Sequence, residues 1–229
     1  MHVPDGFLDG PTSVGTIAIA ATGVGIALWR SRSTLDDRTA PMAGMAAVFV
    51  FAAQMLNFPV GAGTSGHLLG GALAAVLVGP WTATLCITVV VMVQALLFAD
   101  GGITALGTNV TLLAIVGVWV GWAAFRGASL VLPRRTGSVP LAAAVGAFVS
   151  VPVTALAFVG LYAVGGQAPI PLDTLTTAML TWHVGIGLGE AVITFLVIAS
   201  ISSTRPDLVA GAAGRRPADL TQRPTEVAA

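Results

Sequence analysis

Two histidines in unusual contexts offer the clearest chemistry in this sequence. His67 ends a loop of small residues, 57–67 (NFPVGAGTSGH), and His2 directly follows the first residue. A glycine-rich loop can approach other backbone closely, and neutral imidazole is the commonest metal ligand in proteins. Either histidine alone is explained as well by a structural role. Together they predict a metal site that joins the start of the chain to His67.

The first two residues can give a metal ion three nitrogens. A metal bound to both the Met1 amine and the His2 amide closes a five-membered chelate ring, and His2 Nδ1 then closes a six-membered ring. His67 can supply a fourth nitrogen. A plane of four nitrogens suits Ni²⁺ or Cu²⁺, with Co²⁺ also possible, whereas Zn²⁺ favours a tetrahedron and Mg²⁺ or Ca²⁺ favours oxygen. Because the amine and the amide must lose protons, binding should weaken steeply as the pH falls.

The residues that follow this pair predict a turn. Residues 4–6 (PDG) have turn chemistry and can fold the start of the chain inward. Asp5 then either accepts a hydrogen bond that fixes the turn or the His2 ring, or simply faces solvent. Residues 1–13 contain no Lys or Arg, unlike a signal peptide, so we expect the mature chain to begin at Met1.

The composition is that of an integral membrane protein. Of the 229 residues, 55% are hydrophobic and 9% are charged, and the mean hydropathy is +0.91. Charged residues make up about 25% of a soluble domain. The single cysteine, Cys86, excludes a disulfide framework. Lysine is absent, and the ten arginines form three clusters: Arg30, Arg32 and Arg38; Arg126, Arg134 and Arg135; and Arg205, Arg215, Arg216 and Arg223.

Apolar stretches and arginines together predict an all-α integral membrane protein, a bundle of seven transmembrane helices. A membrane-spanning helix needs about 20 apolar residues. The predicted spans are 12–29, 41–57, 67–79, 81–98, 103–125, 139–164 and 175–201. Seven spans place all ten arginines on one side, which is the cytoplasm by the positive-inside rule. The N-terminus is then outside and the C-terminus is cytoplasmic.

The segment 67–99 admits one helix or two. A single helix of that length would be about 48 Å long, too long for one crossing of a hydrocarbon layer of roughly 30 Å. Residues 79–81 (GPW) favour a break, since proline lacks an amide donor and disfavours helix in the residue before it. Two crossings also keep Arg126, Arg134 and Arg135 inside, so two helices are predicted.

One domain and one tail are expected. Residues 1–202 form a single transmembrane metal-binding domain, which begins with a metal-chelating segment over 1–11. Pro152 is expected to kink the sixth span. Residues 203–229 are rich in Pro, Gly, Ala and charge, and they predict a disordered cytoplasmic tail.

Few polar residues lie inside the predicted spans. Glu190 is the only acid there, seven positions after His183 on one helix face. Ionisable groups at membrane depth are costly and usually face a partner or an aqueous cavity. Glu190 therefore either serves a site, as a relay or as support for its ligands, or ties its helix into the bundle. Gln54, Gln94 and Asn109 are expected to hydrogen-bond between helices.

Four segments form linked motifs: residues 1–8 (MHVPDGFL), 63–72 (GTSGHLLGGA) with 79–81 (GPW), 100–109 (DGGITALGTN) and 183–190 (HVGIGLGE). In this order they resemble the CbiM/NikM family, the substrate-capture membrane subunits of energy-coupling-factor (ECF) transporters for nickel and cobalt. The resemblance covers roughly residues 1–202. Residues 4–6 and 64–67 look more like the nickel branch than the cobalt branch, so nickel is slightly favoured.

The resemblance implies a site, a location and partners. The transported Ni²⁺ or Co²⁺ would be held by Met1, His2 and His67, with no other cofactor, in the cell membrane of a prokaryote. The implied partners are a transmembrane coupling subunit (CbiQ/NikQ-like), cytoplasmic ATPases (CbiO/NikO-like) and a small accessory membrane subunit (CbiN/NikN-like), with no nucleic acid. The chain itself is not expected to be an enzyme, because it contains no phosphate-binding Gly-x-x-x-x-Gly-Lys-Ser/Thr loop.

Two other functions compete with this interpretation. A stand-alone metal-ion channel or proton-coupled carrier could use His183 and Glu190, although the chain shows no internal repeat of the kind common in such carriers. A membrane enzyme could use Ser65 as nucleophile and His67 as base, but nothing in the sequence orients that pair. Neither alternative uses the nitrogens at the start of the chain.

Overall fold

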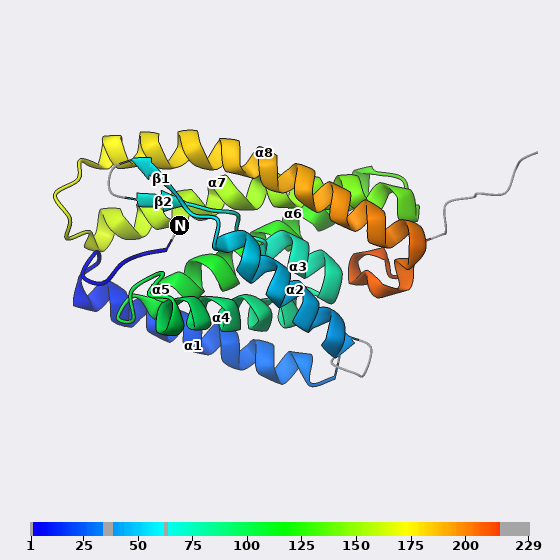
Figure 1. The fold of residues 1–229 in the computed structure, drawn as a ribbon, viewed down its shortest axis with the longest axis horizontal. Coiled ribbons are helices and arrows are strands. Elements are labelled where there is room, and N and C mark those ends of the chain that lie inside the picture. Colours follow the sequence, from blue (N-terminus) through cyan, green and yellow to red (C-terminus); the bar gives the residue numbers. More distant parts are fainter. Residues whose placement is uncertain (1, 34–38, 62–63, 216–229) are drawn as a thin grey trace, which may run out of the picture.

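The computed structural model describes residues 2–33, 39–61 and 64–215, which form a bundle of helices (Figure 1). Its longer helices are α1 (Gly10–Ser31), α2 (Thr39–Gln54), α3 (Gly71–Val78), α4 (Pro80–Leu97), α6 (Val118–Val131), α7 (Val139–Gly165) and α8 (Leu172–Thr204). The shorter elements are β1 (Phe58–Gly61), β2 (Thr64–Gly66), α5 (Leu106–Val110), the π-helix η1 (Thr111–Gly117) and the 3₁₀ turns η2 (Thr136–Ser138), η3 (Pro206–Leu208) and η4 (Ala210–Ala212).

Among the described residues, five helical segments are long and apolar enough to cross a membrane: α1, α4, Leu106–Val131, Thr136–Gly165 and α8. The apolar helix α2 is shorter, with 16 residues, and α3 has eight. The predicted helical membrane architecture is therefore confirmed at this level, and the number of seven crossings stays a prediction.

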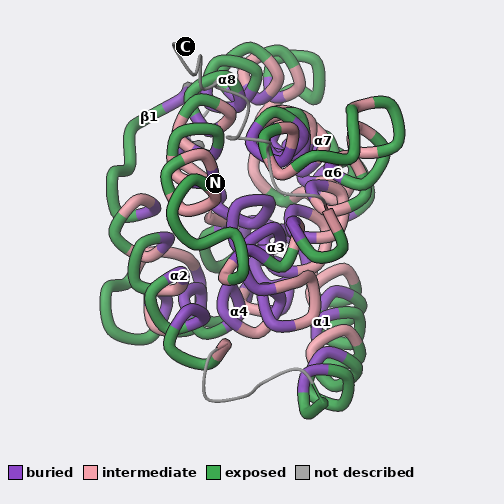
Figure 2. Tube along the Cα trace, turned by 90° about the vertical axis from the view of Figure 1, so that its right-hand side faces the viewer, coloured by how far each residue is buried: buried purple, intermediate pink, exposed green. Residues whose placement is uncertain are grey.

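Helix α3 lies at the centre of the bundle. All eight of its residues are buried, and Figure 2 shows α3 and α4 largely in the buried colour while much of α1 is exposed. Close packing depends on small residues, since a Cβ added to Gly121 would lie 2.6 Å from the Ala72 Cβ. Gly79 has a φ of 81° between α3 and α4, and Pro80 opens α4. The predicted break between two helices is confirmed.

The all-α expectation missed a small antiparallel hairpin. Residues predicted as a loop after the second helix pair as β1 and β2. The predicted third helix also begins at Gly71 rather than at residue 67. The cause is local, because the N–H groups of Leu69 and Gly70 donate to a side chain of another helix, and Gly70 has a φ of 73°.

The fifth predicted helix is longer and less regular than expected. It begins at Leu106 and continues to Val131, with the seven-residue π-helix η1 in its middle. Such π segments are rare and are frequent at functional sites. The next helix, α7, runs through Pro152.

Part of the predicted disordered tail is folded. Residues 206–212 form the turns η3 and η4, and a Cβ added to Gly211 would lie 2.8 Å from Phe125 Cζ. Arg215 Nη2 donates to Ser129 Oγ at 2.6 Å. Contact with α6 thus orders a segment whose composition alone suggests disorder, while the rest of the predicted tail, 216–229, lies outside the described residues.

The two ends of the bundle differ in charge. The N-terminal segment, the hairpin and the first turn of α8 lie at one end, where the acids Asp5, Asp9, Asp100 and Asp173 are found (Figure 1). The arginines of the described residues belong to segments at the other end: Arg30, Arg32, Arg126, Arg134, Arg135, Arg205 and Arg215. The hairpin end is therefore the one that attracts cations.

Candidate metal centre

The N-terminal segment, residues 2–9, enters the bundle beside the hairpin and is held by Asn109 of α5. The Val3 N–H donates to Asn109 Oδ1 at 2.7 Å, and Asn109 Nδ2 donates to the Val3 carbonyl at 3.0 Å. The Gly102 N–H donates to the same carbonyl at 2.9 Å. Val3 is fully buried, so both of its backbone polar groups are satisfied inside the protein.

A turn follows, as predicted from the sequence. The Phe7 N–H donates to the Pro4 carbonyl at 3.4 Å, and Gly6 has a φ of 73°. Asp5 Oδ1 accepts hydrogen bonds from Thr104 N–H at 2.7 Å and from Thr104 Oγ1 at 2.5 Å. These bonds favour the carboxylate and lower the pKa of Asp5. Asp5 therefore fixes the turn against the loop before α5.

The second half of the N-terminal segment is anchored to α7. The Asp9 N–H donates to the Gly165 carbonyl at 2.7 Å, and the Phe7 ring stacks on Phe158 with 5.6 Å between centroids. Asp9 Oδ1 also accepts from the Thr12 N–H at 2.8 Å, which caps α1. Contacts with α5 and with α7 thus hold the segment that carries His2.

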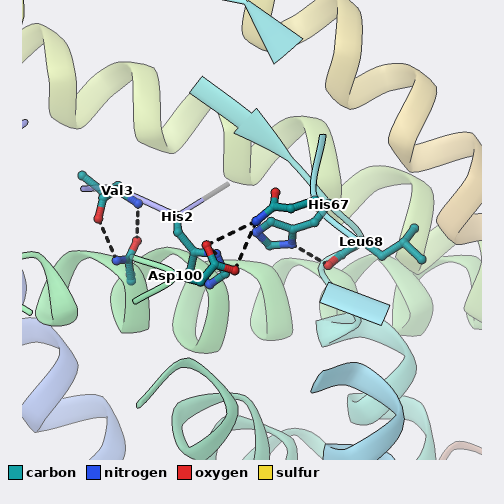
Figure 3. Close-up of polar contacts among 7 residues, drawn as sticks. His2, Val3, His67, Leu68 and Asp100 are labelled. Carbon is teal, nitrogen blue, oxygen red and sulfur yellow. Dashed lines mark hydrogen bonds and ion pairs between the residues drawn. The ribbon is translucent and has the colours of Figure 1, made fainter. Parts of the chain in front are cut away.

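His2 and His67 stack against each other in the interior (Figure 3). Their ring centroids are 4.6 Å apart and their planes differ by 23°. His67 is fully buried, and its Nδ1–H donates to the Leu68 carbonyl at 2.8 Å. The Nε2 lone pair of His67 then has no partner among the described residues. Burial lowers the pKa of both rings, that of His67 well below its usual value, so both are in the neutral form that binds metals.

Asp100, in the loop after α4, lies beside His2. Its Oδ1 is 3.2 Å from His2 Nδ1, and Asn57 Nδ2 donates to Oδ1 at 3.2 Å and to Oδ2 at 3.1 Å. The interaction with His2 lowers the pKa of Asp100. His2 Nε2 has no partner within the described part of the chain. A carboxylate with a fixed orientation therefore borders the imidazole pair.

Glu190 of α8 holds the backbone that follows His67. Its Oε2 accepts from the Leu69 N–H at 2.7 Å and its Oε1 accepts from the Gly70 N–H at 2.9 Å. Gln54 Nε2 donates to the Leu69 carbonyl at 2.6 Å. Glu190 is 2% exposed, and both of its oxygens are occupied by this loop. Of the roles left open by the sequence, the contacts favour support of the site together with attachment of α8.

His183 makes different contacts from Glu190. Its Nδ1–H donates to the Met179 carbonyl of the same helix at 2.7 Å, and its buried Nε2 has no partner in the described residues. The hydrogen bonds of Glu190 go to the His67 loop instead. The geometry therefore gives no direct pair of the kind that a His183–Glu190 proton path would need.

The structure brings together the two histidines that the sequence placed in one site, and Met1 lies outside the described residues. Their role as metal ligands stays a prediction. In the described segments, no group of three or more His, Cys, Asp or Glu side chains is arranged to hold a metal ion. The contact of Asp100 with His2 was missed, because the sequence marked Asp100 only as the first residue of the motif 100–109.

Comparison with known proteins identifies the family. The family model CbiM, described as "Cobalt uptake substrate-specific transmembrane region", matches residues 2–208. The chain belongs to the CbiM family. With five long apolar helical segments among its described residues, this member of the family is a multi-pass membrane protein, consistent with the plasma membrane of a prokaryote. The family resemblance seen in the motifs is confirmed.

Relatives of the CbiM chain match along most of its length. A putative metal transport protein of Haloquadratum walsbyi is 39% identical over 210 residues, 91% of this chain and 93% of the relative. A putative fused nickel transport protein, NikMN, of Archaeoglobus fulgidus is 37% identical over 210 residues, 91% of this chain and 68% of that protein. A crystal structure of a truncated transition metal transporter has a TM-score of 0.82 and 31% identity, covering 89% of this chain and 99% of that one.

Proposed function

We propose that this CbiM chain captures Ni²⁺ or Co²⁺ as the substrate-binding membrane subunit of an ATP-driven importer of the ECF type. One observation carries the proposal: two neutral, buried imidazoles meet beside the start of the chain, and the Nε2 atom of His67 has no partner among the described residues. A buried polar atom without a partner costs about 1–3 kcal/mol, and a bound metal ion would remove part of that cost. The family and the named transport functions of its relatives support metal uptake.

The proposed ligands are four nitrogens from three residues. They are the Met1 amine, the His2 amide, His2 Nδ1 and His67 Nε2. His67 presents the correct nitrogen, since its Nδ1–H is held by the Leu68 carbonyl. His2 Nδ1 lies 3.2 Å from Asp100 Oδ1. A planar set of four nitrogens slightly favours Ni²⁺ over Co²⁺.

The proposed orientation places the site at the outer face. The arginine-rich end of the bundle would then face the cytoplasm, as the positive-inside rule requires, and the hairpin end would face outward. On this model seven helices cross the membrane, with α2 and the buried α3 as the two shorter crossings. Packing of α3 inside the bundle supports a short helix there, because its neighbours shield it from lipid.

The proposed partners supply the ATP hydrolysis for which this chain has no nucleotide-binding loop. The sequence contains no nucleotide-binding loop, so ATP hydrolysis is assigned to cytoplasmic ATPases that act through a transmembrane coupling subunit. Fused NikMN relatives are longer than this chain, which supports association with a small membrane subunit of the N type. The chain is therefore proposed to bind the ion and to leave its translocation to a complex.

Calorimetry of nickel binding to purified protein tests this function. One residue added before Met1 converts the amine into an amide and should lower the affinity by at least ~100-fold, since loss of a ligand exceeds the 10–100-fold effect of removing outer contacts. His67→Ala should also weaken binding while the bundle stays folded. The matched control adds one residue after Ala229, which should change nothing. Unchanged affinity of the N-terminally extended protein would exclude the amine as a ligand.

A further inference from the structure

The turn that carries Asp100 has an unusual backbone. Ala99 has a φ of 52° and Gly101 a φ of 100°, and Ala99 is the only non-glycine residue with positive φ in the described part of the chain. Side chains other than glycine rarely adopt this conformation, and they keep it where surrounding contacts enforce it. Here the Asp100 N–H donates to the Gln94 carbonyl at 3.0 Å. The conformation of the turn at the end of α4 therefore orients Asp100 toward His2.

Asp100 connects solvent to the imidazole pair. Its side chain is 19% exposed, whereas the side chain of His2 is 2% exposed and His67 is fully buried. Within the described segments it is the only carboxylate at ion-pair distance from a histidine. Asn57 donates to both carboxylate oxygens and fixes their orientation from the other side. An ion that approaches from the hairpin end meets this carboxylate before the buried rings.

Among the described residues, Asp100 is the carboxylate that lies at ion-pair distance from a ring of the pair. Asp5 accepts hydrogen bonds from Thr104, and Asp9 caps α1. The imidazoles themselves are neutral. A divalent cation that leaves water for a neutral, buried pocket loses hydration free energy, and a fixed negative charge at the opening offsets part of that loss.

We propose that Asp100 is the receiving carboxylate of the site: it binds hydrated Ni²⁺ or Co²⁺ first and passes the ion to Nδ1 of His2. The inference rests on the function proposed above, because it needs His2 as the final ligand. Asp100 then acts while the ion enters the site, and the four nitrogen atoms of Met1, His2 and His67 hold the ion once it is bound.

The distance between the two atoms fits such a transfer. Nitrogen and oxygen ligands lie about 2.0–2.2 Å from a small divalent metal, so two ligands at right angles are about 3 Å apart. The observed 3.2 Å between Asp100 Oδ1 and His2 Nδ1 lets one ion bind both atoms at once. The ring proton of His2 moves from Nδ1 to Nε2 through water as the bond between Nδ1 and the ion forms, and the bond to Asp100 then breaks. Water ligands leave as nitrogens replace them, and the Met1 ammonium and the His2 amide each release one proton to water. No change of oxidation state is needed.

Stopped-flow measurement of nickel association tests the inference in purified protein. Asp100→Asn keeps the size of the side chain and removes its charge. Its association rate constant should fall by at least ~10-fold and should depend less on salt, because electrostatic focusing raises such rates by 10–10³-fold. The dissociation rate should change much less. Asp173→Asn, which removes an acid from the first turn of α8 at the same end of the bundle, should behave like wild type.

The outcomes separate the two proposals. An association rate within about twofold of wild type, or a loss of affinity that lies wholly in dissociation, would overturn the role of Asp100 as receiving carboxylate. Failure of the wild-type protein to bind either nickel or cobalt would instead overturn the proposed function. If Asp100→Asn does not fold, Asn57→Ala provides the second test. It leaves the charge but frees the carboxylate, and a slower association with unchanged melting temperature is expected.

Discussion

The backbone N–H of Leu69 donates to Oε2 of Glu190 at 2.7 Å, across 121 positions of sequence. The Gly70 N–H donates to the other oxygen of the same carboxylate. One side chain of α8 thus fixes the backbone that directly follows His67. The direction in which His67 presents Nε2 therefore depends on a helix from the other end of the chain, and Glu190 is a positioning residue for the proposed site.

Glu190→Gln should weaken nickel binding. A glutamine offers one oxygen, so its NH₂ group would face one of the two backbone N–H donors. An unpaired buried donor costs about 1–3 kcal/mol, and removal of an outer contact typically lowers metal affinity by 10–100-fold. We expect an affinity loss in that range on calorimetry and a lower melting temperature.

The control for this substitution is Thr194→Val. Thr194 is buried in the same helix, and its hydroxyl has no partner among the described residues, so loss of that hydroxyl should leave nickel affinity unchanged. If Glu190→Gln bound nickel normally while uptake ceased, the result would favour the competing carrier that uses His183 and Glu190.

Asn109→Ala should uncouple the N-terminal segment from α5. The amide of Asn109 both accepts from and donates to the Val3 backbone, and alanine leaves the buried Val3 N–H unpaired. Because Val3 follows the proposed chelating pair, nickel affinity should fall by about 10–100-fold. The visible absorption of bound Ni²⁺ should also lose its square-planar signature, which a purely structural role would not change.

Thr108→Val is the matched control in the same short helix. It removes the hydrogen bond between Thr108 Oγ1 and Thr16 Oγ1, 2.8 Å long, but does not touch the N-terminal segment. We expect a similar loss of stability and a normal nickel spectrum. An Asn109→Ala protein with the wild-type spectrum and affinity would show that the Val3 contact does not position the chelate.

The helices of this protein follow from hydropathy, and its irregular elements do not. Long apolar stretches and the break before Pro80 fix most helix positions, because these signals are local. The hairpin has only seven residues in its two strands, which are rich in glycine, so their sequence pattern is too short to predict strands. The π-helix depends on packing, for Thr111 Oγ1 donates to the Thr16 carbonyl of α1.

The same contrast applies to the candidate site. Residue chemistry alone placed His2 with His67, and the rings are in contact. The sequence left several roles open for Glu190 and named none for Asp100. Their partners lie about a hundred residues away in sequence, and only the fold determines which polar groups meet. Local patterns therefore indicate the candidate ligands but not the groups that orient them.

Gly102→Ala should displace the start of the chain. A Cβ at Gly102 would lie 2.4 Å from the Asp5 backbone nitrogen and 2.5 Å from Asp5 Oδ1, distances that force the segment to move. Nickel affinity should fall by about 10-fold or more, by the same logic as for other groups that orient ligands. Gly127→Ala in α6 is the control, because nothing lies within 4 Å of its added Cβ. Equal affinities of the two variants on calorimetry would contradict the close contact.

The contribution of His2 and His67 to the stability of the metal-free protein should fall as the pH falls through about 6.5. Burial lowers the pKa of His2 and His67 below their ordinary value of 6.5, so the unfolded chain binds protons in this range that the folded protein does not. The melting temperature of the wild type relative to that of His67→Ala should therefore be lower at about pH 5.5 than at about pH 7.5. The pKa values of Asp5 and Asp100 are lowered, so the stability that these carboxylates contribute is lost only below about pH 3.8, outside this window. The same pH dependence in wild type and His67→Ala would show that this ring is not buried in its neutral form.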